Sequence, residues 1–245
     1  MAKMEKVGVV TDTTACLPGE LVRQYGIRLV PAGYKLDGRG YKDGELSNEE
    51  FWAKFQSLST MPSSNAVAMV DYMKQFEELA ALTDSIVCIV VSRALSATFA
   101  AAETARDAVC ARHPGLKINV IDSKSSCGAM GFIALEAARA AEAGHGLDEV
   151  TAVAQDMVTR ARYFSAMHSY KYMVKSGRAP QLAMALPADA LIQTKTIIGE
   201  TNGSGKIEFF GRVRGTQKTM QQMIELTAKF LTPDRPAHFL SLIHI

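Results

Sequence analysis

Two predicted hydroxyl-rich turns, each beside a β-like run, hold the residues of this chain that are best suited to bind a ligand. One is the sequence PSSN at residues 62–65, and the other is SRALSAT at residues 92–98, directly after the apolar run 85–91. A small hydroxyl at the carboxyl end of a buried strand, where a helix opens, commonly holds an oxyanion or a carboxylate. The sequence around these segments is largely uncharged and rich in Met and Ala. We therefore predict a ligand that combines an acid with an apolar body.

The elements that must position these hydroxyls alternate between strand and helix up to about residue 145. Short β-branched or apolar runs predict strands at residues 6–11, 27–34, 85–91 and 117–121. Helical periodicity and capping residues predict helices at 18–25, 48–58, 70–81, 96–110, 128–143 and 147–161. The second of these helices begins with a capping box, formed by Ser47 and Glu50.

This alternation predicts a doubly wound parallel sheet, on which ligands bind beyond the carboxyl ends of the strands. Several polar residues fall at such ends, and their clustering predicts a single site: Asp12, Ser92, Ser96, Asp122 and Ser123.

The pattern changes after residue 160. Residues 163–168, 194–200 and 206–213 are predicted strands, and the turn at 202–205 makes a hairpin of the last two. The fold class is therefore α/β with two domains: residues 1–160 form a parallel doubly wound domain, and residues 161–245 form an α+β domain with a mixed or antiparallel sheet. Residues 234–245 hold no helical period and end within an apolar run. We expect this tail to be non-native and the second domain to be incomplete.

Composition excludes several classes of function. The net charge is +2 over 245 residues, which gives no broad field for nucleic acid or a membrane surface. No run of eighteen apolar residues and no signal peptide is present, so we expect a cytoplasmic protein without stable membrane insertion. The four cysteines and five histidines show no metal-ligand spacing. We expect free thiols in a reducing compartment, no metal and no cofactor.

Catalysis is the alternative to binding, and Asp12 or Ser96 would carry it. An Asp at a strand end can accept a phosphoryl group, but such sites place a second acid two residues on, where this chain has Thr14. Capping of a turn is the commoner role, and a role in ordering the site through hydrogen bonds stays open. Neither Ser64 nor Ser96 lies in a GxSxG elbow. Hydrogen-bond donation to a carboxylate suits both serines better, although a cap or turn role is about as common for any single serine.

Basic residues in the second domain could also meet an acid. Arg178 follows a helix-like stretch, Arg212 and Arg214 close a hairpin, and Lys218 lies on the next predicted helix. Such a cluster can bind a carboxylate, a phosphate or an acidic partner. A solvated face is the usual role of scattered basic residues.

The ordered set of these segments resembles the DegV family, fatty-acid-binding proteins that include the FakB subunits of bacterial fatty acid kinase. The resemblance covers about residues 7–230. It rests on VTDTTACLP at 10–18, YKDG at 41–44, PSSN at 62–65 in place of a Thr-Ser-Gln-Pro turn, SRALSAT at 92–98 for Ser-x-x-Leu-Ser-Gly-Thr, IDS at 121–123, SGR at 176–178 for Gly-Gly-Arg, and RVRG at 212–215.

The resemblance implies a two-domain carrier, not an enzyme, with one long-chain fatty acid buried between its domains. Its carboxylate would be held by Ser64 and Ser96, and an ATP-binding kinase partner would convert the presented acid to an acyl phosphate. Arg214 would lie near the carboxylate or face the kinase. Further residues that could support the site are Asp12, Thr13, Asn65, Ser92, Thr98 and Ser123.

The chain departs from the family pattern in the segments that would hold the carboxylate. Ser64 replaces the usual Thr, Asn65 and Ala66 replace Ser-Gln, and Ala97 replaces a Gly. The extra methyl of Ala97 would alter the geometry at the head group. The family's carboxyl-terminal segment, with a His near a Gly-Pro-Gly turn, is absent, so we expect weakened binding.

Overall fold

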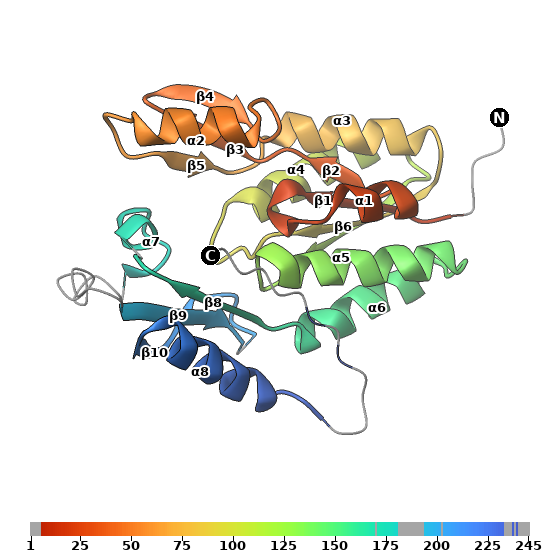
Figure 1. Cartoon of the computed structure of the whole chain (residues 1–245). Coiled ribbons are helices and arrows are strands. Elements are labelled where there is room, and N and C mark those ends of the chain that lie inside the picture. Colours follow the sequence, from red (N-terminus) through yellow and green to blue (C-terminus); the bar gives the residue numbers. More distant parts are fainter. Residues whose placement is uncertain are drawn as a thin grey trace. The chain divides into compact units, whose positions relative to one another are not determined.

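The structure is a computed structural model, and it describes residues 6–169, 171–180, 194–201, 203–232, 237 and 239 (Figure 1). The chain divides into two compact units. The first unit holds residues 1–161 together with 202–206, and the second unit holds residues 162–201 and 207–245.

A four-stranded parallel sheet forms the centre of the first unit. It is built from β1 (Gly8–Asp12), β2 (Arg28–Val30), β6 (Ser85–Val90) and β7 (Lys117–Asp122), in the order β2-β1-β6-β7 (Figure 1). All three strand pairs are parallel. The parallel sheet predicted from the alternation of strands and helices is therefore confirmed. Because the strands run the same way, their carboxyl ends lie along one edge.

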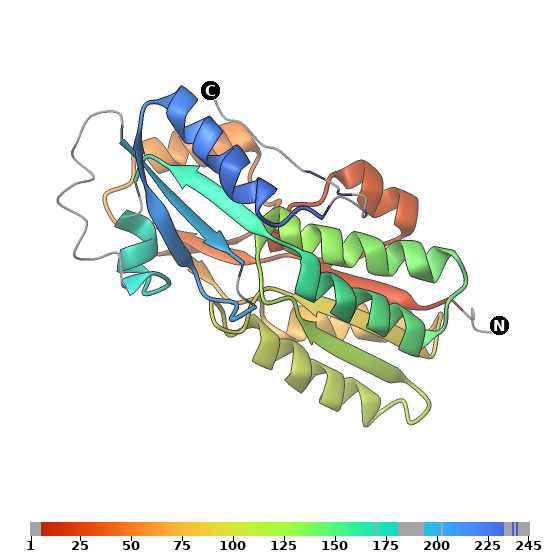
Figure 2. The same cartoon turned by 90° about the horizontal axis from the view of Figure 1, so that it is seen from below.

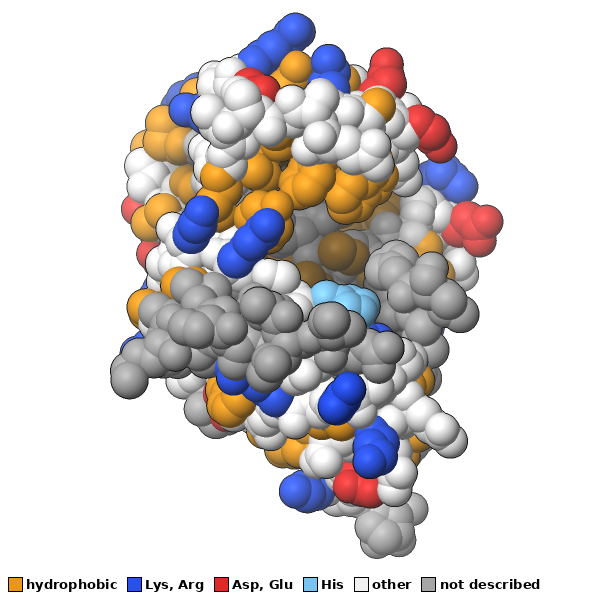
Figure 3. Space-filling model, turned by 60° about the vertical axis from the view of Figure 1, so that its left-hand side comes forward, with side chains coloured by type: hydrophobic (Ala, Val, Ile, Leu, Met, Phe, Trp, Pro, Cys, Tyr) orange, Lys and Arg blue, Asp and Glu red, His pale blue; other side chains and the backbone are white. Residues whose placement is uncertain are grey.

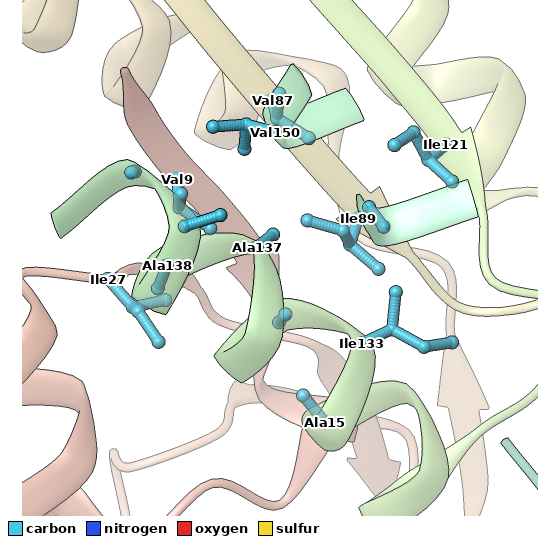
Figure 4. Close-up of a cluster of buried hydrophobic side chains, with 14 of the residues drawn as sticks. Val9, Ala15, Ile27, Val87, Ile89, Ile121, Ile133, Ala137, Ala138 and Val150 are labelled. Atoms are coloured by element: carbon cyan, nitrogen blue, oxygen red, sulfur yellow. The ribbon is translucent and has the colours of Figure 1, made fainter. Parts of the chain in front are cut away.

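Helices cover both faces of this sheet. Val87 and Ile89 of β6 pack with α5 (Cys127–Glu142) and α6 (Leu147–Arg160), in the cluster shown in Figure 4. Ile86, Cys88 and Val90 pack on the other face, where the cluster includes residues of α3 (Met69–Ala80) and α4 (Thr98–Cys110). Figure 1 shows α3 and α4 above the strands and α5 and α6 below them, and Figure 2 views the sheet from the side of α5 and α6. An unbroken apolar run is the pattern expected of a strand buried on both faces.

The Ala-rich helix α5 approaches the start of the chain very closely. The short 3-10 helix η1 (Thr13–Ala15) follows β1, and a Cβ added at Gly131 would lie 2.5 Å from the Ala15 carbonyl oxygen. That oxygen is backbone and cannot rotate away. Glycine at residue 131 is therefore required by the contact between η1 and α5.

We expect Gly131→Ala to destabilise the protein by about 1–3 kcal/mol, because it overpacks this contact. The direction of the change in stability is diagnostic, because Gly→Ala inside a helix otherwise stabilises a protein by up to about 1 kcal/mol. The matched control is Gly19→Ala at the start of α1 (Gly19–Tyr25), where a Cβ would approach the flexible end of Arg23 at 3.3 Å. Urea denaturation measures both variants, and a Gly131→Ala protein as stable as the wild type would show that the contact is looser than described.

A second, smaller sheet belongs to the same unit and corrects two predictions. It pairs β3 (Gly33–Leu36) antiparallel with β4 (Arg39–Lys42) and β5 (Ser63–Asn65). The single strand predicted over residues 27–34 is wrong, because it divides at Pro31 into β2 and β3. Proline has no N–H to continue a ladder. The turn predicted at 62–65 is also wrong, since residues 63–65 form an edge strand.

Helix α2 (Asn48–Gln56) contacts this small sheet. The predicted capping box is confirmed: the Glu50 backbone N–H donates to Ser47 Oγ at 3.2 Å, and the Ser47 N–H donates to Glu50 Oε2 at 2.8 Å. The ring of Phe51 contacts that of Tyr34 on β3 edge-on, with centroids 5.5 Å apart. Trp52 remains 55% exposed. Hydrophobic side chains, with lysines and arginines beside them, reach the surface on the face shown in Figure 3.

The second unit is built on an antiparallel sheet of β8 (Tyr163–Met167), β9 (Thr194–Glu200) and β10 (Glu208–Arg214), in the order β10-β9-β8. Its described helices are α7 (Lys171–Lys175) and α8 (Thr216–Ala228). The predicted strands and the antiparallel character of this part are confirmed. The expectation about residues 234–245 falls almost wholly outside the described residues.

None of the helices in the described ranges is both long enough and apolar enough to cross a lipid bilayer.

Candidate functional site

Asp12 is the centre of a buried hydrogen-bond network at the carboxyl edge of the parallel sheet. It is the last residue of β1 and is 0% exposed. Its Oδ1 accepts from the Thr14 backbone N–H at 3.0 Å and from the Thr14 hydroxyl. Its Oδ2 accepts from the Tyr72 hydroxyl at 3.3 Å and from the Val91 N–H at 3.4 Å. Asp12 thus joins the ends of β1 and β6 to helix α3.

This arrangement gives Asp12 an ordering role. Burial raises the pKa of its carboxyl group, and the hydrogen bonds from Thr14, Val91 and Tyr72 oppose that shift. Burial and the neighbouring Asp12 also raise the pKa of Tyr72, so the phenol keeps its proton and can donate. Both carboxylate oxygens are occupied by protein donors, which leaves no lone pair aimed at a substrate. The geometry therefore disfavours Asp12 as a nucleophile.

Thr13 joins the same turn to the start of the small sheet. Its Oγ1 accepts from the Ala32 backbone N–H at 3.0 Å. The side chain is half-buried, so it supports the loop between β2 and β3.

Ser96 and Thr98 form a pair of hydroxyls at the amino end of α4. Their Oγ and Oγ1 atoms are 2.8 Å apart, and the Thr98 backbone N–H donates to Ser96 Oγ at 3.3 Å. Thr98 is 2% exposed, and its Oγ1 also accepts from the Val67 N–H at 3.2 Å. Ser96 is half-buried.

The burial of Thr98 favours one direction for the bond between the two hydroxyls, since either oxygen can be the donor. A buried hydroxyl that leaves its proton without an acceptor costs about 1–3 kcal/mol. Thr98 avoids this cost by donating to Ser96, which is the neighbouring oxygen. In that direction Ser96 accepts from Thr98 and has its own proton left to donate. The positive end of the α4 dipole lies beside it and favours an anion.

Ser92 lies at the same edge, but its hydroxyl is engaged inside the first unit. It is 0% exposed, donates to the Gly205 carbonyl oxygen at 2.7 Å and accepts from the Ala94 N–H at 3.2 Å. A Cβ added at Gly205 would collide with this hydroxyl. Ser92 therefore anchors residues 203–206 to the loop after β6.

Ser123 and Asp122, at the end of β7, also serve the fold. Ser123 is 1% exposed, and its hydroxyl donates to the Ser125 carbonyl at 2.9 Å. Asp122 Oδ1 accepts from the backbone N–H groups of Arg93 at 3.2 Å and Lys124 at 3.0 Å. These bonds join the end of β7 to the loop that carries Ser96.

Ser64 and Asn65 are exposed residues of the edge strand β5. Ser64 lies opposite Tyr34, and Asn65 lies opposite Gly33. The bond from Val67 to Thr98 ties the chain just after β5 to the Ser96–Thr98 pair. Three residues span at most about 11 Å, so Ser64 is held near that pair.

Arg214 belongs to the second unit. It is the exposed last residue of β10 and lies opposite Thr194 of β9. The predicted pairing of the two strands is confirmed, and Arg214 ends the second of them.

The structure places the predicted polar residues along one edge of the sheet, but it uses their polar groups in two ways. Ser96 keeps a donor available, while the polar groups of Asp12, Ser92 and Ser123 are used within the protein. Tyr72 and the Val67 backbone were not predicted as members of this cluster, because their partners Asp12 and Thr98 lie 60 and 31 residues away in the sequence. Within the described part of the chain, no three His, Cys, Asp or Glu side chains converge as a metal site.

The fold and this edge of hydroxyls define an α/β protein with a parallel sheet in one unit and an antiparallel sheet in the other. The family model described as "Uncharacterised protein, DegV family" matches residues 6–244. The chain belongs to the DegV family.

Curated relatives match most of the chain. A DegV domain-containing protein of Clostridium acetobutylicum is 31% identical over 219 residues, which is 89% of this chain and 75% of the relative. One of Mycobacterium tuberculosis is 32% identical over 233 residues, 94% of this chain and 78% of the relative.

Solved structures share the fold. A DegV-family protein of Ruminococcus gnavus, refined with vaccenic acid, has a TM-score of 0.84 at 19% identity and covers 94% of this chain and 80% of its own. DegV of Bacillus subtilis, described as a fatty acid binding protein, has a TM-score of 0.77 at 25% identity, with 92% and 78% covered. The fatty acid kinase B3 protein of Streptococcus pneumoniae, loaded with linoleic acid, has a TM-score of 0.78 at 18% identity, with 91% and 78% covered.

Proposed function

We propose that this protein binds a long-chain fatty acid and carries it without transforming it. The observation that carries the proposal is the pair of hydroxyls on Ser96 and Thr98, 2.8 Å apart at the amino end of α4, with Thr98 buried. With Thr98 as the donor of that bond, Ser96 has a proton left to donate. A carboxylate accepts hydrogen bonds only, so a donor beside a helix amino terminus suits it. Ser64, held nearby on β5, supplies the second hydroxyl.

Thr98 and Asp12 support the site by positioning the Ser96 hydroxyl. Thr98 orients the Ser96 hydroxyl, and Asp12 fixes the ends of β1 and β6 from which the Ser96 loop departs. The relatives support the same ligand class, since the neighbours from Ruminococcus gnavus, Bacillus subtilis and Streptococcus pneumoniae are described with fatty acids or as binding them.

The proposed role includes a partner protein that carries out the reaction on the bound acid. Conversion of a carboxylate to an acyl phosphate needs a phosphoryl donor such as ATP, and the sequence holds no phosphate-binding loop motif. We infer that the bound acid is presented to an ATP-dependent kinase. The Streptococcus pneumoniae neighbour, a fatty acid kinase protein, supports this role.

We expect protein purified from bacteria to retain a fatty acid. Burial of an acyl chain contributes on the order of 0.8 kcal/mol per CH₂ before the entropic cost of binding, so exchange is slow. Mass spectrometry of an organic extract should detect a carboxylic acid in a molar amount close to that of the protein. The control is an unrelated protein from the same host, purified alike. A folded preparation that yields no acid, and that takes up none from palmitate added in solution, would contradict the proposal.

A further inference from the structure

Cys16 and Cys127 come from segments far apart in sequence that the fold brings into contact. Cys16 directly follows η1, and Cys127 is the first residue of α5. The close approach of Gly131 to Ala15 holds these two segments together in the first unit. Neither cysteine has a part in the carboxylate site described above.

The two thiols are partners. Their side chains are hydrogen-bonded to each other, and Cys16 Sγ also donates to the Thr14 carbonyl oxygen at 3.5 Å. Cys16 is exposed and Cys127 is half-buried, so a small reagent can reach the pair. The other cysteines differ, because Cys88 is buried and Cys110 bonds to the Leu116 carbonyl oxygen.

We propose that Cys16 and Cys127 form a redox-active dithiol, which a hydroperoxide oxidises to a reversible disulfide. A metal is disfavoured as the ligand, since no group of three or more ligating side chains occurs among the residues that the structure describes. Two adjacent thiols, one of them exposed, are what reversible oxidation requires. This proposal does not depend on fatty-acid binding.

The reaction takes two balanced steps. The Cys127 sulfur attacks one oxygen of hydrogen peroxide, the O–O bond breaks, and a sulfenic acid and water result. The Cys16 sulfur then attacks the sulfenic sulfur, an S–S bond forms, and the hydroxyl leaves as a second water with the Cys16 proton. The protein loses two hydrogen atoms, and the peroxide is reduced to two molecules of water.

The order of the steps follows from the environment of each sulfur. The hydrogen bond with Cys127, burial and the charges of Cys127, Asp43 and Asp12 raise the pKa of Cys16, so that thiol keeps its proton. Cys127 begins a helix of 16 residues, and a helix amino terminus favours negative charge. We therefore assign the peroxide-reactive sulfur to Cys127 and the resolving thiol to Cys16.

The test oxidises the reduced, full-length protein with graded hydrogen peroxide under native conditions. Remaining thiols are then alkylated, and the peptides are analysed by mass spectrometry. We expect one peptide pair that joins Cys16 to Cys127, lighter by two hydrogens, in most molecules before Cys88 or Cys110 changes. Dithiothreitol should restore both thiols.

Matched variants separate the pair from general oxidation. Cys110→Ser should keep the cross-link. Cys16→Ser should lose it and leave a Cys127 sulfenic acid that dimedone traps. If the wild type shows sulfinic acids at these two cysteines without a cross-link, or cross-links Cys110 equally often, the proposal is wrong.

Discussion

Replacement of Ser96 by Ala is expected to weaken fatty-acid binding roughly 10- to 150-fold. Hydrogen bonds to charged groups contribute about 1.5–3 kcal/mol, and each 1.4 kcal/mol is a factor of ten in the dissociation constant. The variant removes the hydroxyl that has a proton left for the carboxylate when Thr98 is the donor of the Thr98–Ser96 bond. Titration of the delipidated protein with a fluorescent fatty acid measures the change.

Two controls make this result specific. Thr104→Ala removes an exposed hydroxyl from the same helix, where it donates to the Ala100 carbonyl oxygen, and should leave the affinity unchanged. Because Ser96 also accepts from Thr98, urea denaturation of Ser96→Ala must show that the protein is folded at the titration conditions. A folded Ser96→Ala protein with wild-type affinity would remove Ser96 from the site.

Asp12→Asn is expected to destabilise the protein by about 1–3 kcal/mol, although the shape of the side chain is kept. Each carboxylate oxygen of Asp12 accepts from one backbone N–H and one hydroxyl. An amide has one oxygen, so in either orientation its NH₂ group faces a backbone N–H. The half-buried Thr14 N–H or the buried Val91 N–H then loses its partner. Chemical denaturation at pH 7 measures the loss.

The pH dependence of this difference has a defined sign. Burial raises the folded pKa of Asp12 above its ordinary value of 3.8. The folded state therefore binds this proton more tightly than the unfolded state. The stabilisation from this proton is fully present below pH 3.8 and is lost as the pH rises through the folded pKa. Since Asn does not titrate, the stability advantage of the wild type over Asp12→Asn should grow as the pH falls through this window.

The matched control is Asp156→Asn on α6, where an exposed carboxylate pairs with Arg160 at 2.8 Å. Exposed pairs contribute roughly 0–1 kcal/mol, so this variant should stay close to the wild type. Equal stabilities of Asp12→Asn and Asp156→Asn would contradict the ordering role of Asp12. Turnover of a phosphate or ester substrate that Asp12→Asn abolishes in a folded protein would favour the catalytic alternative.

Local sequence was sufficient for much of the fold. The run 85–91 is apolar throughout because β6 is covered on both faces, and Ser47 with Glu50 begins α2 through contacts only three residues apart. The gathering of polar residues at the carboxyl edge could also be predicted. Parallel strands all end at the same edge of a sheet, so the residues that follow them lie along that edge.

The role of each hydroxyl could not be predicted, because it depends on distant partners. Ser92 resembles Ser96 in sequence, yet its proton goes to Gly205, 113 residues away. Tyr72 reaches Asp12 across 60 residues. The strand β5 exists only because β3 offers it an edge, and its own sequence, PSSN, is typical of a turn. Short-range patterns cannot distinguish a satisfied hydroxyl from an available one.

Residues 202–206 belong to the first unit, so neither unit is a single continuous segment of the chain. The chain passes between the units after residues 161, 201 and 206, whereas a simple tandem arrangement would need one passage. A fragment ending at Ala161 would carry the whole parallel sheet but would lack the Gly205 carbonyl that accepts from the buried Ser92 hydroxyl. The first unit therefore depends on a segment that the second half of the chain returns to it. Excision or exchange of either unit at a single cut would leave a buried polar group without its partner.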